Sequence, residues 1–237
     1  MNSSIELSQL KQLEKRYSQR NVQRWRMTLL RARLRFNLSL VRIFRRTLAV
    51  SVAILALLLG WPLWLFLACA IKLTDGGSIL YWQRRVGYRG QLFDFPKFRS
   101  MVINAEALQA ALTNQHQDNH TFKLLRDPRI TWIGRIIRRF SLDEFPQLWC
   151  VLKGEMTLVG PRPPLPQEVA QYGLYARQRL EVQPGLTCIW QVSGRAEVAF
   201  AGQLEMDLAY IRQRSLKLDV VILLQTIPAV LFGRGAY

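Results

Sequence analysis

The chain has 237 residues, which suits one globular domain with appended segments. Its 33 Lys and Arg against 16 Asp and Glu give a formal net charge of +17, which indicates an anionic partner: nucleic acid, a phospholipid surface or phosphorylated substrates. The three cysteines, Cys69, Cys150 and Cys188, lack the spacing of metal ligands, and Cys69 lies in an apolar run. A disulfide framework is therefore disfavoured and a reducing cytosol is favoured.

Residues 1–46 form a basic N-terminal extension, with 12 Lys and Arg against only two acids, Glu6 and Glu14. Leucines at positions 7, 10 and 13, followed by a run of arginines, predict a helix. We expect this helix to be amphipathic and to lie on anionic lipid. Binding to nucleic acid is the alternative, but the membrane segment that follows makes it redundant.

Residues 47–71 contain no charged side chain, and as a straight helix of about 37 Å they would cross a hydrocarbon core of ~30 Å. Trp61 and Pro62 interrupt this segment, because a proline removes a backbone hydrogen bond and bends the helix. Basic residues flank both ends, and the positive-inside rule keeps such flanks in the cytoplasm. We therefore predict a re-entrant membrane helix that is broken at Trp61 and Pro62. An ordinary crossing with a tolerated kink is the alternative.

Residues 78–98 alternate apolar and polar side chains around Gly87 and Gly90, which predicts a β-hairpin or short sheet. Pro96 limits the second strand to an edge. Helices are predicted at 102–112 and 130–140, with a loop at 113–120. That loop contains His116 and His120, whose i, i+4 spacing suits zinc. No third ligand is evident, so a solvated helix or loop is favoured.

Asp143 and Glu144 are adjacent carboxylates among the arginines Arg138, Arg139 and Arg162. One carboxylate can hold Mg2+ while the other attacks phosphorus, and guanidinium groups can bind phosphate oxygens through paired hydrogen bonds. The alternative is that the two acids cap a helix, since the apolar residues that follow them have helical spacing.

The C-terminal third contains further elements that could support such a site. The prolines of Pro161–Pro164 fix the backbone around Arg162, although a proline-rich linker is the alternative. Residues 184–187 are predicted to form a turn, and residues 190–195 a short strand that ends in a loop. Asp207 falls on a predicted helix, and residues 216–231 on an interfacial or core helix.

Four sequence blocks follow one another from the hairpin onward: KFRSM at 97–101, DPRITWIGRIIRRFSLDEFPQLWCVLKGEMTLVGPRP at 127–163, QPGLTCIWQVSGR at 183–195 and LEMDLAYIRQRSLKLDV at 204–220. Together they resemble the bacterial sugar transferase family, the monotopic polyprenyl-phosphate phosphoglycosyl transferases. The resemblance runs from about Arg45 to Leu231, or roughly four fifths of the chain.

The resemblance implies an α+β, predominantly helical fold. It would combine a re-entrant membrane helix, interfacial amphipathic helices and a small β-hairpin in a cytoplasmic catalytic domain at 72–237. The implied location is the cytoplasmic (inner) membrane of a bacterium, with the catalytic domain facing the cytoplasm. The implied partners are the lipid bilayer, a polyprenyl phosphate acceptor and a nucleotide-sugar donor, and not nucleic acid. A second copy of the chain and downstream glycosyltransferases are further candidate partners.

The implied reaction transfers a sugar-1-phosphate from a nucleoside diphosphate sugar, which we expect to be a UDP-sugar, to undecaprenyl phosphate. It would be the first membrane step in making an exopolysaccharide, O-antigen or other glycan. Asp143 would attack the sugar-linked phosphorus and expel UMP, and the lipid phosphate would then attack the aspartyl phosphosugar. Two rivals remain: a lipid-surface phosphohydrolase at the same site, and a non-catalytic basic membrane scaffold.

The resemblance also assigns roles to individual residues. Asp143 and Glu144 are expected to be catalytic and to hold Mg2+. The expected substrate-binding residues are Lys97, Arg99, Arg138, Arg162 and Arg195, and the expected supporting residues are Pro161, Pro163 and Asp207. For Lys97 and Arg99 a solvated charge pair is the alternative, and for Asp207 a capping or ion-pairing role.

The chain departs from the family pattern at three positions. Counting back from Pro62, Ala49 stands where members usually carry an aspartate, which puts the polar contact of the membrane anchor in doubt. Cys150 and Cys188 replace a common asparagine and a usual glycine. Both replacements are small, so we expect the packing to survive and assign neither cysteine a catalytic role.

Overall fold

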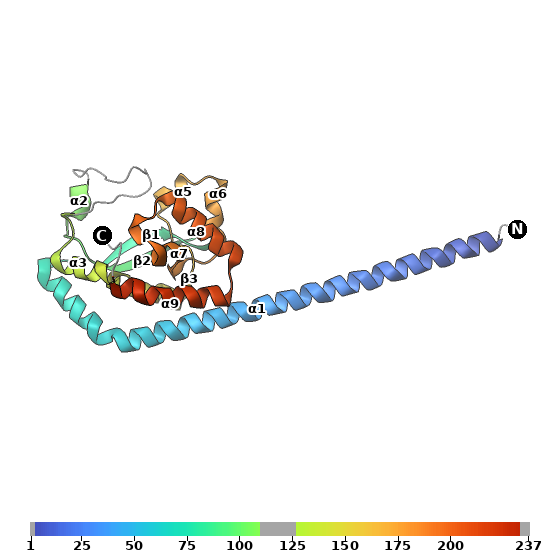
Figure 1. Cartoon of the computed structure of the whole chain (residues 1–237), viewed down its shortest axis with the longest axis horizontal. Coiled ribbons are helices and arrows are strands. Elements are labelled where there is room, and N and C mark those ends of the chain that lie inside the picture. The colour runs from blue at the N-terminus through green and yellow to red at the C-terminus, as the bar shows by residue number, and fades with distance from the viewer. Residues whose placement is uncertain (1–2, 110–126, 233–237) are drawn as a thin grey trace. The chain divides into compact units, whose positions relative to one another are not determined.

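The computed structural model describes residues 3–109 and 127–232, and the predicted loop with His116 and His120 lies outside them. The chain divides into two compact units, Met1–Thr47 and Leu48–Tyr237. Helix α1, Ser3–Asp75, begins in the first unit and continues into the second (Figure 1). The helix predicted for the N-terminal extension is thus confirmed. Among the described residues, α1 is the one helix long and apolar enough to cross a membrane.

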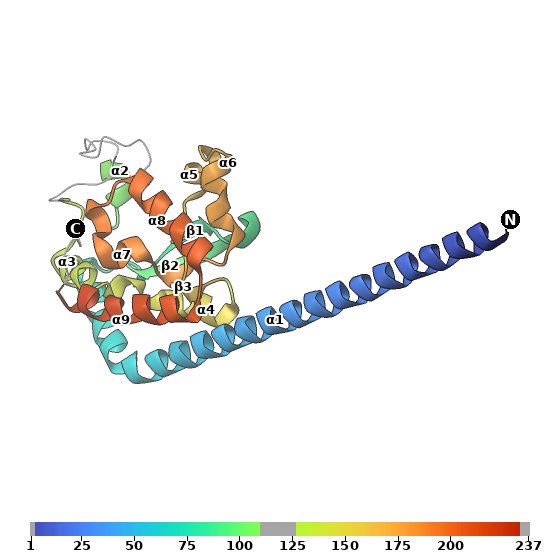
Figure 2. The same cartoon turned by 45° about the vertical axis from the view of Figure 1, so that its right-hand side comes forward.

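Within the second unit α1 bends but does not end. Pro62 lies inside the helix, and both views show the change of direction in the cyan part of α1 (Figures 1 and 2). A proline costs one backbone hydrogen bond and clashes with the preceding turn, so the helix kinks there and then resumes. Asp75 ends α1, and Gly76 follows it in the left-handed region at φ 74°.

The predicted hairpin is confirmed. Strand β1, Leu80–Val86, pairs antiparallel with β2, Leu92–Phe98, and the short 3-10 helix η1, Tyr88–Gly90, joins them. Because side chains alternate along a strand, Gln83 and Arg85 share a face with their cross-strand neighbours on β2. Pro96 stands opposite Trp82, in a sheet of two strands where each is an edge.

The other described elements are short, apart from the last two helices. They are α2 Ala105–Gln109, α3 Trp132–Arg139, η2 Leu142–Gln147, α4 Leu148–Lys153, β3 Thr157–Val159, α5 Pro166–Ala170, α6 Leu174–Arg177, η3 Gln178–Glu181, β4 Gly185–Thr187, α7 Ile189–Ser193, η4 Arg195–Glu197, α8 Phe200–Gln213 and α9 Leu216–Phe232. The helices predicted near 130–140, at Asp207 and at 216–231 correspond to α3, α8 and α9. The helix predicted from residue 102 begins at Ala105.

Two predictions between residues 184 and 195 are wrong. The predicted turn contains strand β4, which pairs in parallel with β3, and the predicted strand is helix α7 followed by η4. Gly185 has no side chain, so its backbone can lie against that of Gly160 and join the sheet. The helical turn of α7 buries Trp190, and a segment of five residues is too short for its apolar pattern to separate helix from strand.

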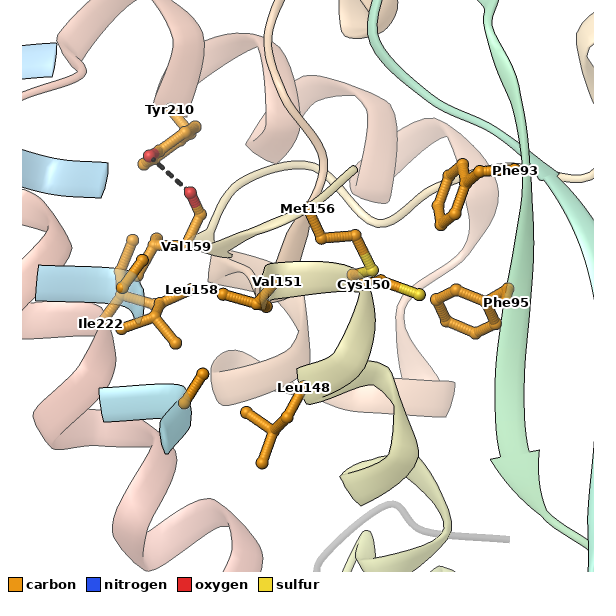
Figure 3. Packing of buried hydrophobic residues seen from close by; sticks show 12 residues of the cluster. Phe93, Phe95, Leu148, Cys150, Val151, Met156, Leu158, Val159, Tyr210 and Ile222 are labelled. Atoms are coloured by element: carbon orange, nitrogen blue, oxygen red, sulfur yellow. Dashed lines mark hydrogen bonds between the residues drawn. The ribbon is translucent and has the colours of Figure 1, made fainter. Parts of the chain in front are cut away.

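The main core lies where β2, α4, β3, α8 and α9 meet (Figure 3). Phe95, Cys150 and Val151 are fully buried there. The Tyr210 hydroxyl donates to the Val159 carbonyl oxygen at 3.0 Å and thereby ties α8 to β3 (Figure 3). Cys150 is a fully buried member of this cluster, in line with the expectation that the packing survives the replacement.

Within the second unit, α1 packs into the core on both sides of its bend. Before the bend, Ala49 and Ala53 belong to the main core. After the bend, Leu67 and Ile71 belong to a second cluster, with Phe98 of β2 and two residues of α3. Ala49, which stands at the position of the usual family aspartate, is thus a buried apolar contact in this protein.

Candidate active site

A cavity of about 700 Å³ opens in the second unit. Seven of the residues proposed from the sequence line it: Lys97, Arg138, Asp143, Glu144, Arg162, Pro163 and Arg195. They come from β2, α3, η2, the segment after β3, and η4. The fold therefore brings together side chains that are up to 98 residues apart in the sequence (195 − 97).

The two carboxylates begin the short helix η2. Ser141, just before it, has φ 53° and ψ 24°, a left-handed conformation that a residue other than glycine rarely adopts. This turn redirects the chain after α3 and places Asp143 and Glu144 in the first turn of η2. The N-cap residues of η2 and of the following helix α4 are Ser141 and Gln147, so neither acid occupies an N-cap position.

Glu144 is held by three side chains. Its Oε1 lies 2.7 Å from Arg162 Nη2 and 3.8 Å from Lys97 Nζ, and its Oε2 accepts a hydrogen bond of 3.4 Å from Gln191 Nε2. Burial alone would raise the pKa of Glu144, but Arg162 and Lys97 outweigh it and hold the pKa below its usual value. Glu144 is therefore an ionised, fixed group.

Asp143 differs from its neighbour because its carboxylate makes no hydrogen bond or ion pair with the residues that the structure describes. Burial raises its pKa; Lys97 opposes this, while the adjacent Glu144 adds to it. A carboxylate that no cation binds directly keeps its lone pairs for reaction. Of the two acids, Asp143 thus has the freedom of a nucleophile and Glu144 the position of a support.

Three cations surround the ring of Phe95, which is fully buried on β2. Arg85 Cζ, Lys97 Nζ and Arg162 Cζ lie 5.3, 5.4 and 6.0 Å from its centroid. Burial, and then repulsion from Arg162, lowers the pKa of Lys97 to about 8 and that of Arg85 to about 10. Burial is the larger cause of both shifts, and the repulsion from Arg162 shows that the cations lie close together here, as they do in anion-binding sites.

Arg85 was missed by sequence reasoning, which treated it as a basic flank of the membrane segment. Its Nη1 donates to the Pro163 carbonyl oxygen at 2.9 Å, and its Nε and Nη2 donate to Gln83 Oε1 at 3.0 and 2.7 Å. These acceptors are neutral, so they orient the guanidinium without cancelling its charge. The alternation of side chains along the strand could have identified Arg85, because Arg84 points to the opposite face and pairs with the exposed Asp94.

Arg179 is a second residue that sequence reasoning missed. It lines the cavity, and its Nη2 lies 2.6 Å from Asp207 Oδ2, with only 4% and 1% of the two side chains exposed. Its Nη1 donates to Tyr172 Oη at 2.9 Å, and its guanidinium lies over the rings of Tyr172 and Phe200. Asp207 does not line the cavity and acts on it through Arg179.

Two further arginines occupy the side of the site nearest η2. Burial lowers the pKa of Arg138, and Asp143 and Asp127 partly offset this. Arg195 has φ 50° and donates from Nη2 to Ser141 Oγ at 3.1 Å. Arg195 thus contacts the turn that positions Asp143, and it also lines the cavity.

The structure does not bring every proposed residue to the cavity. Arg99 is buried and pairs with Asp75, so it fastens the end of α1 to the hairpin. Pro161 accepts a backbone hydrogen bond of 3.0 Å from Gly185 and supports the β3–β4 pairing. Trp61 and Pro62 lie at the bend of α1, away from the cavity lining.

The donor set fits magnesium better than zinc. Among the described residues no three His, Cys, Asp or Glu gather as a metal site. Asp143 and Glu144 are the kind of ligands that Mg2+ commonly takes, since it binds one or two carboxylates and fills its remaining positions with water and substrate phosphates.

This arrangement of a free carboxylate, a fixed carboxylate and several cations coincides with a family match. Residues 40–233 match the family described as bacterial sugar transferase. The chain belongs to the bacterial sugar transferase family. Both the family and the transferase class predicted from the sequence blocks are confirmed.

The chain is also similar in sequence to individual proteins, among them sugar phosphotransferases. The chain is 42% identical over 200 residues to the exopolysaccharide production protein ExoY of Sinorhizobium fredii, covering 82% of this chain and 88% of that protein. It is 42% identical to the undecaprenyl-phosphate galactose phosphotransferase of Salmonella typhimurium, over 83% of this chain and 42% of that protein. It is 41% identical to the undecaprenyl-phosphate glucose phosphotransferase of Komagataeibacter xylinus, over 81% and 37%.

Proposed function

We propose that this protein transfers a sugar-1-phosphate from a nucleoside diphosphate sugar, most simply a UDP-sugar, to a polyprenyl phosphate at the membrane surface. The observation that carries the proposal is the partly buried carboxylate of Asp143, which makes no hydrogen bond or ion pair with the described residues, although the charges of Lys97, Arg138 and Arg162 act on it. The similarity to the undecaprenyl-phosphate galactose and glucose phosphotransferases supports the same reaction class.

In the first step, an oxygen of Asp143 attacks the phosphorus that carries the sugar. The bond from this phosphorus to the bridging oxygen breaks, and UMP leaves with the electron pair. In the second step, an oxygen of the lipid phosphate attacks the same phosphorus and the Asp143 carboxylate departs. The product is a polyprenyl diphosphate sugar. Dividing the reaction lets a soluble donor and a lipid acceptor use one site in turn.

The cations of the site would stabilise the charge that develops on the transferring phosphoryl oxygens. Arg85, Lys97 and Arg162 are already fixed around Phe95, so little reorganisation is needed when the substrate arrives. Glu144 keeps Arg162 oriented through their 2.7 Å ion pair. Arg138, which also lines the cavity and interacts electrostatically with Asp143, would hold a donor phosphate.

Mg2+ is part of the proposal, with Asp143 and Glu144 as the residues that would hold it. When bound, it would neutralise charge on the donor diphosphate and on the leaving nucleotide. Glu144 is suited to this because its pKa is lowered and it is ionised at neutral pH.

We further propose that α1 enters and leaves the membrane on its cytoplasmic side. Two observations support this: the bend at Pro62, and the packing of both arms against the same unit. Large apolar side chains near the bend are exposed, with Leu58, Leu59 and Trp61 at 65%, 73% and 61%. Such a patch needs an apolar partner, which the bilayer would provide.

The deciding experiment is UMP release from a panel of UDP-sugars by protein reconstituted in lipid with Mg2+, with and without undecaprenyl phosphate. Lipid-linked sugar that forms only with intact Asp143 supports the proposal, and the Asp143→Asn variant is the control. Free sugar phosphate in place of lipid-linked product would indicate the phosphohydrolase. If Asp143→Asn is folded and fully functional, the non-catalytic scaffold is the better description.

A further inference from the structure

One wall of the cavity carries no charged side chain. Helices α1 and α9 contribute only uncharged residues to it: Val52, Ala56, Leu223, Thr226, Ala229 and Val230. We call these six the α1–α9 wall. The cations and carboxylates described above come from other elements, so the cavity joins a charged region to an apolar one.

The α1–α9 wall offers little to a sugar or a nucleobase. Its hydroxyl, on Thr226, is already engaged, because it donates to the Ile222 carbonyl oxygen at 2.8 Å and lies 2.9 Å from Thr187 Oγ1. A site that recognises carbohydrate needs hydrogen-bond partners for the substrate hydroxyls. The wall therefore suits a hydrocarbon.

The same two helices carry apolar side chains on their outer surfaces. Leu224 and Ile227 of α9 are 61% and 56% exposed, and Leu55 of α1 is 57% exposed. Figures 1 and 2 both show the cyan part of α1 running beside α9. The wall thus lies on the side of the catalytic unit where hydrocarbon would also contact the outer faces of α1 and α9.

We propose that the α1–α9 wall holds the first isoprene units of the polyprenyl phosphate acceptor, with the lipid phosphate turned toward Asp143. This inference rests on the proposed function and adds to it the binding site of the acceptor tail. It separates the two substrates in space: the nucleotide sugar meets the charged residues, and the tail meets α1 and α9. It follows that the first step, which involves only the donor, does not depend on the wall.

The test introduces a larger side chain into the cavity from each of the two helices of the α1–α9 wall. Ala229→Trp adds bulk on α9 and Val52→Trp adds bulk on α1, whereas Leu224→Trp places the same side chain on the exposed face of α9 as a control. For each protein, three quantities are measured: UMP released in the absence of lipid, the KM for a long polyprenyl phosphate, and the KM for a water-soluble phosphate ester with two saturated or unsaturated isoprene units.

We expect both filling variants to release UMP without lipid as the wild type does, and to show a KM for the long acceptor raised at least ~10-fold, because several buried methylene groups lose their site. The control stays within about twofold of the wild type. In the wild type, the long acceptor has a much lower KM than the short ester, and this preference is reduced in the filling variants.

Three outcomes overturn the proposal. The first is loss of lipid-independent UMP release in a filling variant that folds, which would assign the wall to the donor. The second is an unchanged KM for the long acceptor in both variants. The third, which needs no variant, is an equal KM of the wild type for long and short acceptors. If the wild type releases no UMP without lipid, the covalent mechanism itself fails. The α1–α9 wall is then tested separately, by measuring the binding of polyprenyl phosphate to the three variants directly.

Discussion

Arg195 and Ser141 are 54 residues apart in the sequence, yet they contact each other, and both have a left-handed backbone, with φ of 50° and 53°. The hydrogen bond of 3.1 Å from Arg195 Nη2 to Ser141 Oγ links two strained turns beside the carboxylates. We infer that this contact helps to hold the turn from which η2 and Asp143 start.

A double-mutant cycle tests this link. Arg195→Ala and Ser141→Ala should each lower kcat, and the double variant should lose less than the product of the two effects, with a coupling energy of about 1 kcal/mol. The measurement is the rate of UMP release at saturating donor. Strictly additive effects would show instead that Arg195 acts on the substrate alone.

Arg85 and Arg84 form a matched pair on β1, with one side chain facing the cavity and the other facing solvent. Arg85→Gln removes one of the three cations around Phe95 and should lower kcat/KM for the nucleotide sugar by about 100-fold, as expected for a buried group that binds charge. Arg84→Gln should change it less than twofold, because its partner Asp94 is exposed. Equal losses in both variants would mean that Arg85 acts through general charge only.

The rate should depend on pH through Lys97, whose pKa is lowered to about 8. Below that pH Lys97 is protonated and can stabilise phosphoryl oxygens; above it the amine is neutral, so kcat/KM should fall as the pH rises through about 8. The raised pKa of Asp143 should reduce the rate on the acid side, since a protonated carboxyl cannot attack. In Lys97→Arg the alkaline fall should move to higher pH, and an unchanged profile would exclude Lys97 as its source.

The buried pair of Arg179 and Asp207 should matter for stability as well as for the site. Asp207→Asn leaves a guanidinium that is 4% exposed without its counter-charge, which typically costs about 3–5 kcal/mol. Thermal unfolding in detergent should therefore show a clearly lower midpoint for this variant. Asp94→Asn, which breaks the exposed pair with Arg84, should cost less than about 1 kcal/mol and serves as the control.

The bend of α1 can be tested by its topology. Pro62→Ala restores a backbone donor and should favour a straight helix, which would move one flank across the membrane. A Ser18→Cys reporter in a Cys69→Ala background should resist a membrane-impermeant maleimide applied outside intact cells. The reporter should become reactive when Pro62→Ala is added. Outside labelling with Pro62 intact would contradict the re-entrant arrangement.

The sequence was sufficient to predict the residues that are close to one another along the chain. Asp143, Glu144 and Arg138 lie within seven positions, and a proline-rich segment oriented Arg162, so local chemistry pointed to them. The β-hairpin and the last two helices were also predictable, because strand alternation and helical spacing extend over enough residues to be distinct.

Residues whose position depends on tertiary pairing could not be found in this way. Arg85 enters the cavity because of the hairpin face it occupies, and Arg179 because Asp207 on α8 holds it. Arg99 was proposed for the site together with Lys97 because both belong to the KFRSM block, but β2 ends at Phe98, and Arg99 beyond it pairs with Asp75 at the end of α1. The β3–β4 pairing depends on the contact of Gly160 with Gly185, which no local pattern shows.

The attachment of Asp75 to Arg99 fixes the end of α1 to the hairpin that carries Lys97. The 13 residues that follow Pro62, up to Asp75, span about 20 Å of helix, against ~15 Å for the hydrocarbon of one leaflet. In the proposed arrangement, this second arm therefore works as a spacer of fixed length between the bend and the catalytic residues. The height of Asp143 above the bilayer would follow from the cytoplasmic leaflet alone, so membranes that differ only in the opposite leaflet should support similar rates.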